Sequence, residues 1–443
     1  MKLLSDLLIT RALPLLGTLA LLESTATGEE NCLDLDALLS DDAMLDKLIL
    51  NDSDSPFALV PTGEPASEPT ALVATQEPLP EAVEAEPTEE SVSLDALLDS
   101  FPDPQWDWET SVAGGIGYKR NVLFSAFDTD DSSFTSLEFD STLIRLNQPD
   151  DWQFFAYLLA ENKHYFDVEG LGDEWLAILI AQAEWPLKDH WRVGLSGQYT
   201  YLEQAFSLAF EEFDFGSTQI VLHQPEITPN LSYRFLERAY VKVELPMAMN
   251  WFQESDQDYN QLGVDVKVGT TGPQGGGLEL TYGCERRNYD ERLVRDVSGN
   301  ALAGESLEWR QHQLELIWSH YFDNGKAWRS ITGLRLRKIE DNGVGYHDFW
   351  MYRASQRLIY GQDSWTITTK ISYTYHDYPV QTVGEDSPNH RNRSRLAVGL
   401  DMECKFGDDW RMIAGYEFED YLSNVVEDEY DVHVMSIGLR RSF

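Results

Sequence analysis

Hydrophobic and polar residues alternate with a period of two along most of the chain after residue 105. In the stretch 365–376, the odd positions carry mainly large hydrophobic residues such as Trp365 and Ile371, whereas the even positions are polar. The stretches 241–250 and 395–406 repeat the pattern. Strict alternation is typical of a β-strand with one face in apolar and the other in polar surroundings. The pattern therefore predicts an all-β fold for residues 106–443.

The length of these stretches separates a membrane barrel from a soluble sandwich. Strands of soluble proteins usually have about 5–6 residues, but the alternating runs here last roughly 10–16 residues, which is enough for a tilted strand to cross a bilayer. We therefore predict a transmembrane antiparallel β-barrel.

Short and long connections alternate between the predicted strands. The short polar turns lie at 147–151, 188–190, 236–238, 272–275, 323–326, 361–363 and 407–409. Longer acidic stretches lie between them, and the clearest are 128–133, 285–306, 378–391 and 420–429. This alternation is typical of periplasmic turns and extracellular loops in outer-membrane barrels. It implies about 16 strands, with both ends of the barrel domain in the periplasm.

Tryptophans recur just after the short turns. Aromatic rings with a polar tip prefer the interface of a bilayer, where one part contacts lipid and the other stays hydrated. A shared offset from the turn favours one girdle at one membrane depth over separate packing roles. The predicted girdle consists of Trp152, Trp191, Trp328, Trp365 and Trp410.

The last strand, 430–443, ends in Phe443, carries Leu439, Ile437 and Met435 on the same face, and contains Gly438. It resembles the C-terminal assembly signal of Gram-negative outer-membrane β-barrel proteins, although Arg441 stands where an apolar or aromatic residue is expected. The resemblance implies an outer-membrane location, with outer-membrane lipid and the barrel-assembly machinery as partners. Porins of this size are often trimers, so an oligomer is also compatible with it.

A second resemblance lies in the glycine-rich segment 114–122, with the sequence Gly-Gly-Ile-Gly-Tyr-Lys-Arg-Asn-Val. This segment looks like the first strand of barrels associated with exopolysaccharide export or surface assembly. It implies an alternative function, namely secretion of a surface polysaccharide or of another assembly substrate.

The charge of the chain is unevenly distributed. The 443 residues contain 76 acidic and 33 basic residues, for a net charge of -43. A nucleic-acid partner is excluded because no basic field exists to attract phosphate. Residues 1–26 are predicted to be a secretory signal peptide, with basic Lys2 and Arg11 and a short apolar core.

Residues 27–105 form a predicted disordered periplasmic segment that is acidic and rich in proline. It holds twenty acidic residues and one base, Lys47, and therefore contributes about -19 to the net charge. Such a composition buries too little apolar surface to offset the entropy of ordering. The motif Leu-Asp-Ala-Leu-Leu occurs at 35–39 and 94–98. It is either a docking motif for a periplasmic partner or a transient helix in a linker.

If the apolar face of each strand points to lipid, the other face lines the lumen and is unexpectedly basic on the later strands. We expect Arg335, Arg353 and Lys370 to lie at similar mid-height on three consecutive strands. One hypothesis is a water-filled pore that favours anionic solutes; the alternative is a set of internal salt bridges with no transport role. The predicted lumenal residues are Arg329, Arg335, Arg337, Arg353, Arg357, Lys370, Arg393, Arg395, Glu244 and Asp265.

No spacing of His, Cys, Asp or Glu points to a cofactor or a metal site. The three cysteines are scattered, and no nucleophile motif of the Gly-x-Ser-x-Gly kind is present. We therefore expect no enzymatic activity. The leading interpretation is a porin-like channel for passive diffusion of small hydrophilic solutes, with anionic solutes as the candidate preference. The alternatives are the secretion barrel and a structural barrel with a plugged lumen.

Overall fold

The structure of this chain is a computed structural model. It describes residues 105–443, with the exception of 126–128, 147–151, 167, 169–170, 189, 206–218, 254, 273–274, 363 and 384–387. The predicted signal peptide and the predicted acidic segment up to residue 104 lie outside the described residues, and so does the predicted turn 147–151.

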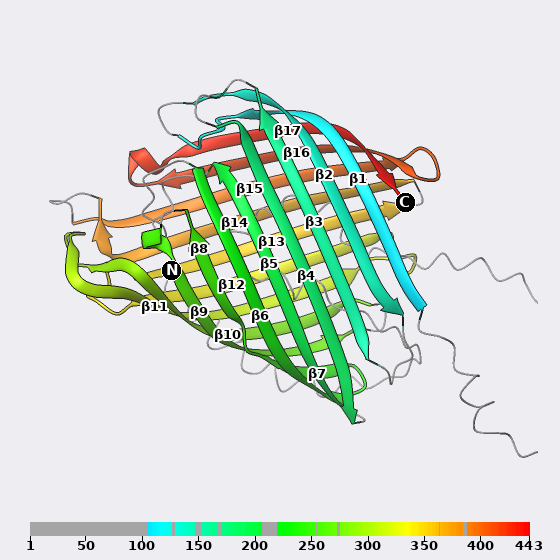
Figure 1. The fold of residues 1–443 in the computed structure, drawn as a ribbon, viewed down its shortest axis with the longest axis horizontal. Helices are drawn as coiled ribbons and strands as arrows, with labels where there is room; N and C mark the ends of the chain where they lie inside the picture. The colour runs from blue at the N-terminus through cyan, green and yellow to red at the C-terminus, as the bar shows by residue number, and fades with distance from the viewer. Residues whose placement is uncertain are drawn as a thin grey trace, which may run out of the picture. The chain divides into compact units, whose positions relative to one another are not determined.

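The described residues form a closed antiparallel β-barrel (Figure 1), which confirms the predicted fold class. Neighbouring strands pair in sequence order, apart from β7 and β8, which do not pair with each other, and β1 pairs with β17 to close the barrel. The strands are β1 (Gln105–Arg120), β2 (Ser132–Leu146), β3 (Gln153–Tyr165), β4 (Asp173–Lys188), β5 (Trp191–Ala205), β6 (Gln219–Leu236), β7 (Ala239–Glu244), β8 (Met247–Phe252), β9 (Tyr259–Thr271), β10 (Gly277–Arg295), β11 (Ala301–Tyr321), β12 (Trp328–Asp341), β13 (Phe349–Gln362), β14 (Trp365–Thr382), β15 (His390–Lys405), β16 (Trp410–Ser423) and β17 (Tyr430–Ser442).

Strands β7 and β8 are two halves of one barrel strand, because both pair with β6 on one side and with β9 on the other. Pro246 lies between them and lacks the N–H group that a continuous ladder needs. Its carbonyl still accepts a hydrogen bond from the Gly263 N–H at 2.8 Å. With the two halves counted together, the barrel described here has 16 strands, as predicted.

The predicted short turns at 188–190, 236–238, 272–275, 323–326, 361–363 and 407–409 coincide with the places where one strand ends and the next begins, but the predicted long loops are partly wrong. The stretch 285–306 is mostly strand, because β10 continues to Arg295 and β11 begins at Ala301. Likewise, β14 continues to Thr382 and β16 to Ser423. A hairpin that projects beyond the bilayer is held by backbone hydrogen bonds with water on its outer face. It therefore needs no apolar outer face, and the sequence pattern does not reveal it.

The outer surface of the barrel is apolar between two aromatic belts. The belt at the short-turn end includes Trp191 and Trp365, and a second belt that we had not predicted includes Tyr199 and Tyr373, all exposed. Eight residues separate the two belts on both β5 and β14. At ~3.4 Å per residue and a tilt of ~40°, this spacing spans ~21 Å, close to the ~25 Å apolar band of outer-membrane barrels. The exterior therefore matches a bilayer.

The predicted girdle residues lie where the short turns enter the strands. Trp191, Trp328, Trp365 and Trp410 are the first residues of their strands, and their side chains are exposed to similar extents on the outside. Trp152 directly precedes β3, and its ring stacks on Trp185 with the centroids 6.5 Å apart. Their common position fits one belt, while the interfacial role itself stays a prediction.

Glycines allow close packing at the closure between β1 and β17. Gly115 lies directly opposite Gly438, so no side chain separates the two strands there. A Cβ on Gly117 would lie 2.2 Å from Cζ of Phe134, so the ring occupies the space that a side chain at 117 would need. Part of the glycine-rich segment that resembles export barrels thus has a packing reason. Phe443, Leu439, Ile437 and Met435 are exposed on the outer face.

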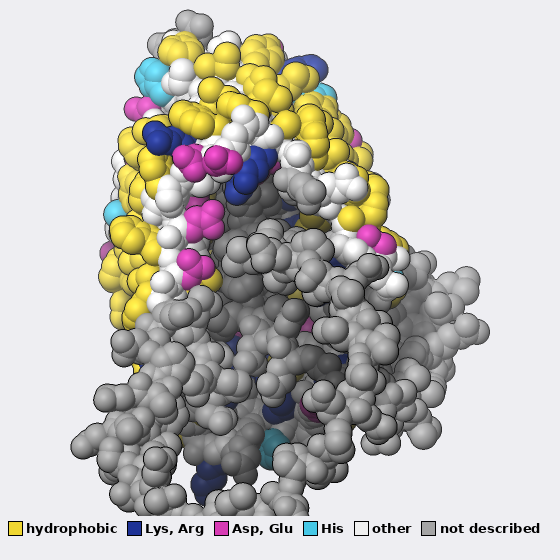
Figure 2. Space-filling model, turned by 90° about the vertical axis from the view of Figure 1, so that its right-hand side faces the viewer, with side chains coloured by type: hydrophobic (Ala, Val, Ile, Leu, Met, Phe, Trp, Pro, Cys, Tyr) yellow, Lys and Arg dark blue, Asp and Glu magenta, His cyan; other side chains and the backbone are white. Residues whose placement is uncertain are grey.

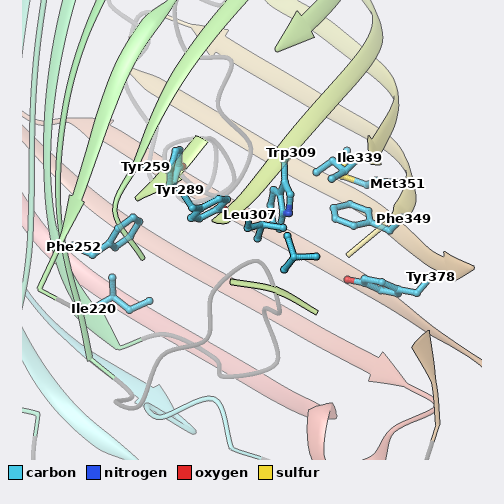
Figure 3. Close-up of a cluster of buried hydrophobic side chains, with 11 residues drawn as sticks. Ile220, Phe252, Tyr259, Tyr289, Leu307, Trp309, Ile339, Phe349, Met351 and Tyr378 are labelled. Atoms are coloured by element: carbon cyan, nitrogen blue, oxygen red, sulfur yellow. The ribbon is translucent and has the colours of Figure 1, made fainter. Parts of the chain in front are cut away.

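Apolar side chains also gather inside the barrel toward the long-loop end (Figure 3), which we had not predicted. This cluster comes from β6 and β8–β14, and its rings lie along the inner face. For example, Tyr289 lies 5.0 Å from Tyr259 and 5.4 Å from Trp309, measured between ring centroids. The inner wall is therefore not uniformly polar.

The described helical segments are the 3-10 turns η3 (Ser255–Gln257) and η4 (Val426–Asp428). In the part of the chain that the structure describes, no helix is both long and apolar enough to cross a membrane.

Candidate functional site: the inner wall of the barrel

Side-chain alternation places every predicted lumenal residue on the inner face. Their sequence neighbours Leu334, Tyr352 and Ile371 are exposed on the outer surface, whereas Arg335, Arg353 and Lys370 are buried inside. The inward positions are Arg329, Arg335 and Arg337 on β12, Arg353 and Arg357 on β13, Lys370 on β14, Arg393 and Arg395 on β15, Glu244 on β7 and Asp265 on β9.

The strand register corrects the expected common height of three of these residues. Arg335 and Arg353 are directly opposite each other, as predicted. Lys370, however, lies opposite Arg357, and the residue opposite Arg353 on β14 is Thr374. Counting from the turns ignored the stagger that a barrel needs in order to close. The basic residues therefore follow a slanted path across β12–β14 rather than a level ring.

Hydrogen bonds fix two of the arginines on β12 against β11. Nε and one Nη of Arg335 donate to the same Glu315 oxygen at 3.0 and 2.7 Å. Arg337 donates in the same way to the amide oxygen of Gln313 at 3.1 and 2.9 Å. In both pairs the acceptor lies directly across the strand pair. In each case two N–H groups of one guanidinium converge on a single oxygen, which limits the orientations that the side chain can take.

Further along the wall, basic residues on β14 and β15 contact carboxylates. Lys370 Nζ lies 3.2 Å from Asp401, and Arg395 donates to Glu419 at 2.6 Å. Arg393 donates to the Tyr421 hydroxyl at 3.2 Å. The alternative of internal salt bridges therefore describes part of the wall. Such pairs also hold charges at fixed positions, so they do not by themselves exclude a selective pore.

Glu244 and Asp265 belong to a separate network on β7 and β9. Glu244 is paired with Lys267 at 2.7 Å and with Lys242 at 3.0 Å. Asp265 lies directly opposite Glu244 in the strand register. Lys242 also lies 3.7 Å from Glu184 on β4. The two predicted acidic positions are thus part of a mixed cluster rather than of the basic wall.

The inward charges differ in sign between two parts of the wall, while β5–β11 carry charges of both signs. Figure 2 shows charged side chains inside a hydrophobic exterior. On β12–β15, the inward basic residues outnumber the inward acidic ones. The basic residues are Arg329, Arg335, Arg337, Arg353, Arg357, Lys370, Arg391, Arg393, Arg395 and Lys405, and the acidic residues are Asp341, Asp401 and Glu403. On β16, β17 and β1–β4, the inward acidic residues outnumber the inward basic ones. The acidic residues are Asp107, Glu109, Glu138, Asp140, Glu161, Glu174, Glu184, Glu417 and Glu419, and the basic residues are Lys119, Lys163, Arg411 and Arg440.

The sequence prediction missed the acidic side and the aromatic part of the wall. Glu138 and Asp140 occupy even-numbered positions of β2, and these positions face inward. The alternation along β2 would therefore have been enough to predict that both face the lumen. The aromatic residues lie where strands continue past the bilayer, and these extensions were interpreted as loops. There, guanidinium groups face the rings; the Arg287 guanidinium lies 5.2 Å from the Tyr259 ring centroid, and that of Arg292 lies 5.3 Å from the Tyr289 ring centroid. Such contacts favour both partners when water is displaced.

Among the described residues, no group of three or more His, Cys, Asp or Glu side chains is placed to hold a metal ion. Three histidines on the outer surface accept or share hydrogen bonds with tyrosines instead. The pairs are Tyr199 with His223, Tyr282 with His312 and Tyr416 with His433, at 2.8–3.0 Å.

No protein-family model matches the chain, and no curated protein matches it. Among solved structures, it is similar to a bacterial polysaccharide outer membrane secretin, at 9% identity with a TM-score of 0.39, over 76% of this chain and 98% of the other. It is also similar to Pseudomonas aeruginosa OccK2 (OpdF), at 12% identity with a TM-score of 0.41, over 76% and 98%. For Acinetobacter baumannii OccAB1, the identity is 8% and the TM-score 0.42, over 76% and 96%. At scores this low, no argument about function rests on these matches.

The chain's own geometry defines its class. A closed barrel leaves no strand edge unpaired, its exterior is apolar between two aromatic belts, and its interior is charged. Only such closed barrels and helices satisfy every backbone group within a bilayer. The described part of the chain is a transmembrane β-barrel of the outer-membrane type.

Proposed function

We propose that this barrel is a porin-like channel that lets small hydrophilic solutes diffuse across the outer membrane. The observation that supports the proposal most strongly is the division of the inner wall into a basic side on β12–β15 and an acidic side on β16, β17 and β1–β4. Charged groups inside a barrel must be paired or hydrated. A purely structural barrel has no need for so many, and none for their separation by sign.

The basic side is the part of the wall that would select. Arg353 and Arg335 face each other across β12 and β13, and Arg357 faces Lys370 across β13 and β14. Glu315 and Asp401 compensate one member of each pair, and the remaining excess of basic groups on this side makes the local wall positive. Fixed charges on a low-dielectric wall raise the local concentration of solutes of opposite sign. We infer a preference for anionic solutes.

The test is single-channel recording of the full chain in a planar bilayer under a salt gradient. The reversal potential gives the ratio of anion to cation permeability. The wild-type chain should favour anions, and the double variant Arg353→Gln/Lys370→Gln should lower the ratio several-fold. Arg441 is a matched control, because it lies outside the barrel over the rings of Trp410 and Phe443. Its glutamine variant should leave the ratio unchanged.

Two results would count against the proposal. A chain that inserts but carries no ionic current would refute the channel and favour the plugged barrel. A permeability ratio that is the same in the double variant and in the wild type would refute selection by the basic side, while leaving the channel in place.

The remaining assignments follow from the same placement. In the outer membrane, the short turns would face the periplasm, and the segment 27–105 would then be free to meet a periplasmic partner. The exposed apolar face of β17, with Gly438 and Phe443, would be recognised by the barrel-assembly machinery. We propose no enzymatic activity and no cofactor.

A further inference from the structure

One part of the outer surface carries basic side chains just beyond the apolar band. We call this group the outer basic patch; it consists of Arg286 on β10, Arg310 and His312 on β11, and Lys338 on β12. The three strands are consecutive neighbours in the barrel. All four residues occupy positions whose side chains point outward, because each lies an even number of residues from an exposed residue on its own strand. The exposed residues are Tyr282 on β10, Leu314 on β11 and Leu334 on β12.

The strand register places this patch at the edge of the apolar band. Tyr282, Leu314, Leu336 and Tyr352 form one row of directly opposed outward residues across β10–β13. His312 and Lys338 lie two residues further toward the long-loop end, where they face each other. The Tyr282 hydroxyl and His312 Nδ1 are 3.0 Å apart, and Lys338 Nζ lies 5.5 Å from the Trp350 ring centroid. Aromatic rings at such an edge mark the headgroup level of a bilayer.

The arrangement inside the patch puts basic groups against each other. Arg286 lies directly opposite Arg310, and like charges in directly opposed positions destabilise a sheet. Glu308 contacts Arg286 at 2.7 Å, and Glu340 bonds to Lys338, so both nearby carboxylates are engaged. Arg310 is exposed and lies directly opposite Glu340, the carboxylate that also bonds to Lys338. Arg286, Arg310 and Lys338 therefore share two carboxylates, which leaves a surplus of basic groups. An anion from outside the chain would relieve the repulsion between the two arginines.

A second outward-facing arginine lies at the same end of the barrel, and its charge is compensated within the chain. On β1 and β17, Arg120 lies directly opposite His433. There, the carboxylate of Asp431 bridges the two, at 3.6 Å from Arg120 and 3.4 Å from His433. No such bridge joins Arg286 to Arg310 within the described residues. In a chain with a net charge of -43, a site where three basic side chains share two carboxylates at the membrane edge points to an external anionic partner.

We propose that the outer basic patch binds the phosphate groups of a phosphorylated glycolipid in the outer leaflet. Guanidinium groups bind phosphate through paired hydrogen bonds, and the adjoining apolar row would contact the acyl chains of the same molecule. This inference rests on the proposed membrane placement, in which the long-loop end faces outward. It does not depend on whether the lumen conducts.

The test is a binding titration of the full chain in detergent with lipid A that carries both phosphates, and with the same lipid after dephosphorylation. The double variant Arg286→Gln/Arg310→Gln should bind the phosphorylated lipid at least tenfold more weakly, because each arginine near an anionic lipid contributes about fivefold. Removal of the phosphates should weaken binding to the wild type by a similar factor. The control Arg120→Gln should stay within twofold of the wild type, since the single arginine at its site is balanced by Asp431, whereas the outer basic patch has more basic groups than carboxylates.

The proposal is overturned if the double variant binds as tightly as the wild type, if Arg120→Gln loses as much affinity, or if the dephosphorylated lipid binds equally well. Thermal unfolding of each variant without lipid shows whether the barrel is intact; Lys338→Gln, on the neighbouring strand, serves as a second variant if the double variant does not fold. Conductance of the same samples tests the channel separately. A chain that binds the lipid and carries no current would refute only the proposed function.

Discussion

Lys370 and Ile371 are consecutive residues of β14, yet they lie in different surroundings. Lys370 is 3% exposed and faces the interior, where it contacts Asp401, whereas Ile371 is 47% exposed on the outer surface. Because side chains alternate across a strand, one step along the chain separates a charged wall from the surface that meets lipid. The two faces therefore follow opposite rules. Outside, a charge is costly; inside, a charge is tolerated when it has a partner or water.

The largest expected effect comes from placing a charge on the wrong face. Ile371→Arg puts a guanidinium inside the apolar band, two residues from Tyr373 and six from Trp365. We expect a loss of about 1–3 kcal/mol in the free energy of unfolding, somewhat less than the ~2–4 kcal/mol of arginine at the midplane of other barrels, because the cost falls toward the interface. Urea-induced unfolding in phospholipid vesicles, followed by tryptophan fluorescence, measures this loss.

The next residue provides the matched control. Ser372 faces inward, opposite Ser355 and Ala397, so Ser372→Arg adds the same group to the charged wall instead. It should cost less than half as much as Ile371→Arg. If Ile371→Arg and Ser372→Arg lowered the free energy of unfolding equally, the inner and outer faces would be equally apolar. The assignment of the two faces would then be wrong.

A smaller effect is expected from breaking a pair on the inner face. In a double-mutant cycle of Lys370→Gln and Asp401→Asn, the proposed hydrated lumen predicts a coupling energy of about 1 kcal/mol, because water would screen the pair. Unfolding of the four proteins in vesicles measures it. The same experiment sharpens the question of the lumen. Removing one partner of a dry, buried pair costs about 3–5 kcal/mol, so a loss of that size in Asp401→Asn would favour a plugged barrel.

Much of this division of faces was predictable from the sequence, because alternation is a local property. The outward set on β14 and the inward set on β12 follow from residue parity alone. The turns were also predictable, since short polar breaks between long alternating runs leave few other interpretations. The hairpin extensions, such as β10 and β11 beyond the bilayer, were not. There the outer face meets water instead of lipid, so the apolar residues lie on the inner face, as Leu307 and Trp309 do, and the outward residues Glu308 and Arg310 are charged. A search for strands with an apolar outer face therefore misses these extensions.

The partners within the wall could not be predicted in the same way. That Arg335 bonds to Glu315, or that Lys370 lies opposite Arg357, depends on the register between strands. A barrel closes only with a particular stagger, which no single strand specifies. Parity thus gave the face of each residue but not its height. The same reason explains why the outer basic patch was missed, since Arg286 and Arg310 are far apart in sequence and meet only through the register of β10 and β11.

The loops at the mouth form a third environment, with water on every side, and there the smallest effect is expected. In the loop between β10 and β11, the exposed Asp296 carboxylate accepts hydrogen bonds from the Asn300 and Ser298 N–H groups at 2.9 and 2.8 Å. The bond from the Asn300 N–H is the main cause that lowers the pKa of Asp296 below its ordinary value of 3.8. A carboxyl whose folded pKa is depressed stabilises the loop fully above its unfolded pKa, and this contribution is lost as the pH falls through the folded value.

Hydrogen-exchange protection of the Asn300 amide should therefore be constant from pH 7 to about 5 and decrease below about 4. Asp296→Asn should remove this dependence, while the amides of β14 between the belts should show none in either protein. Protection at Asn300 that falls equally in the variant would assign the effect to another group.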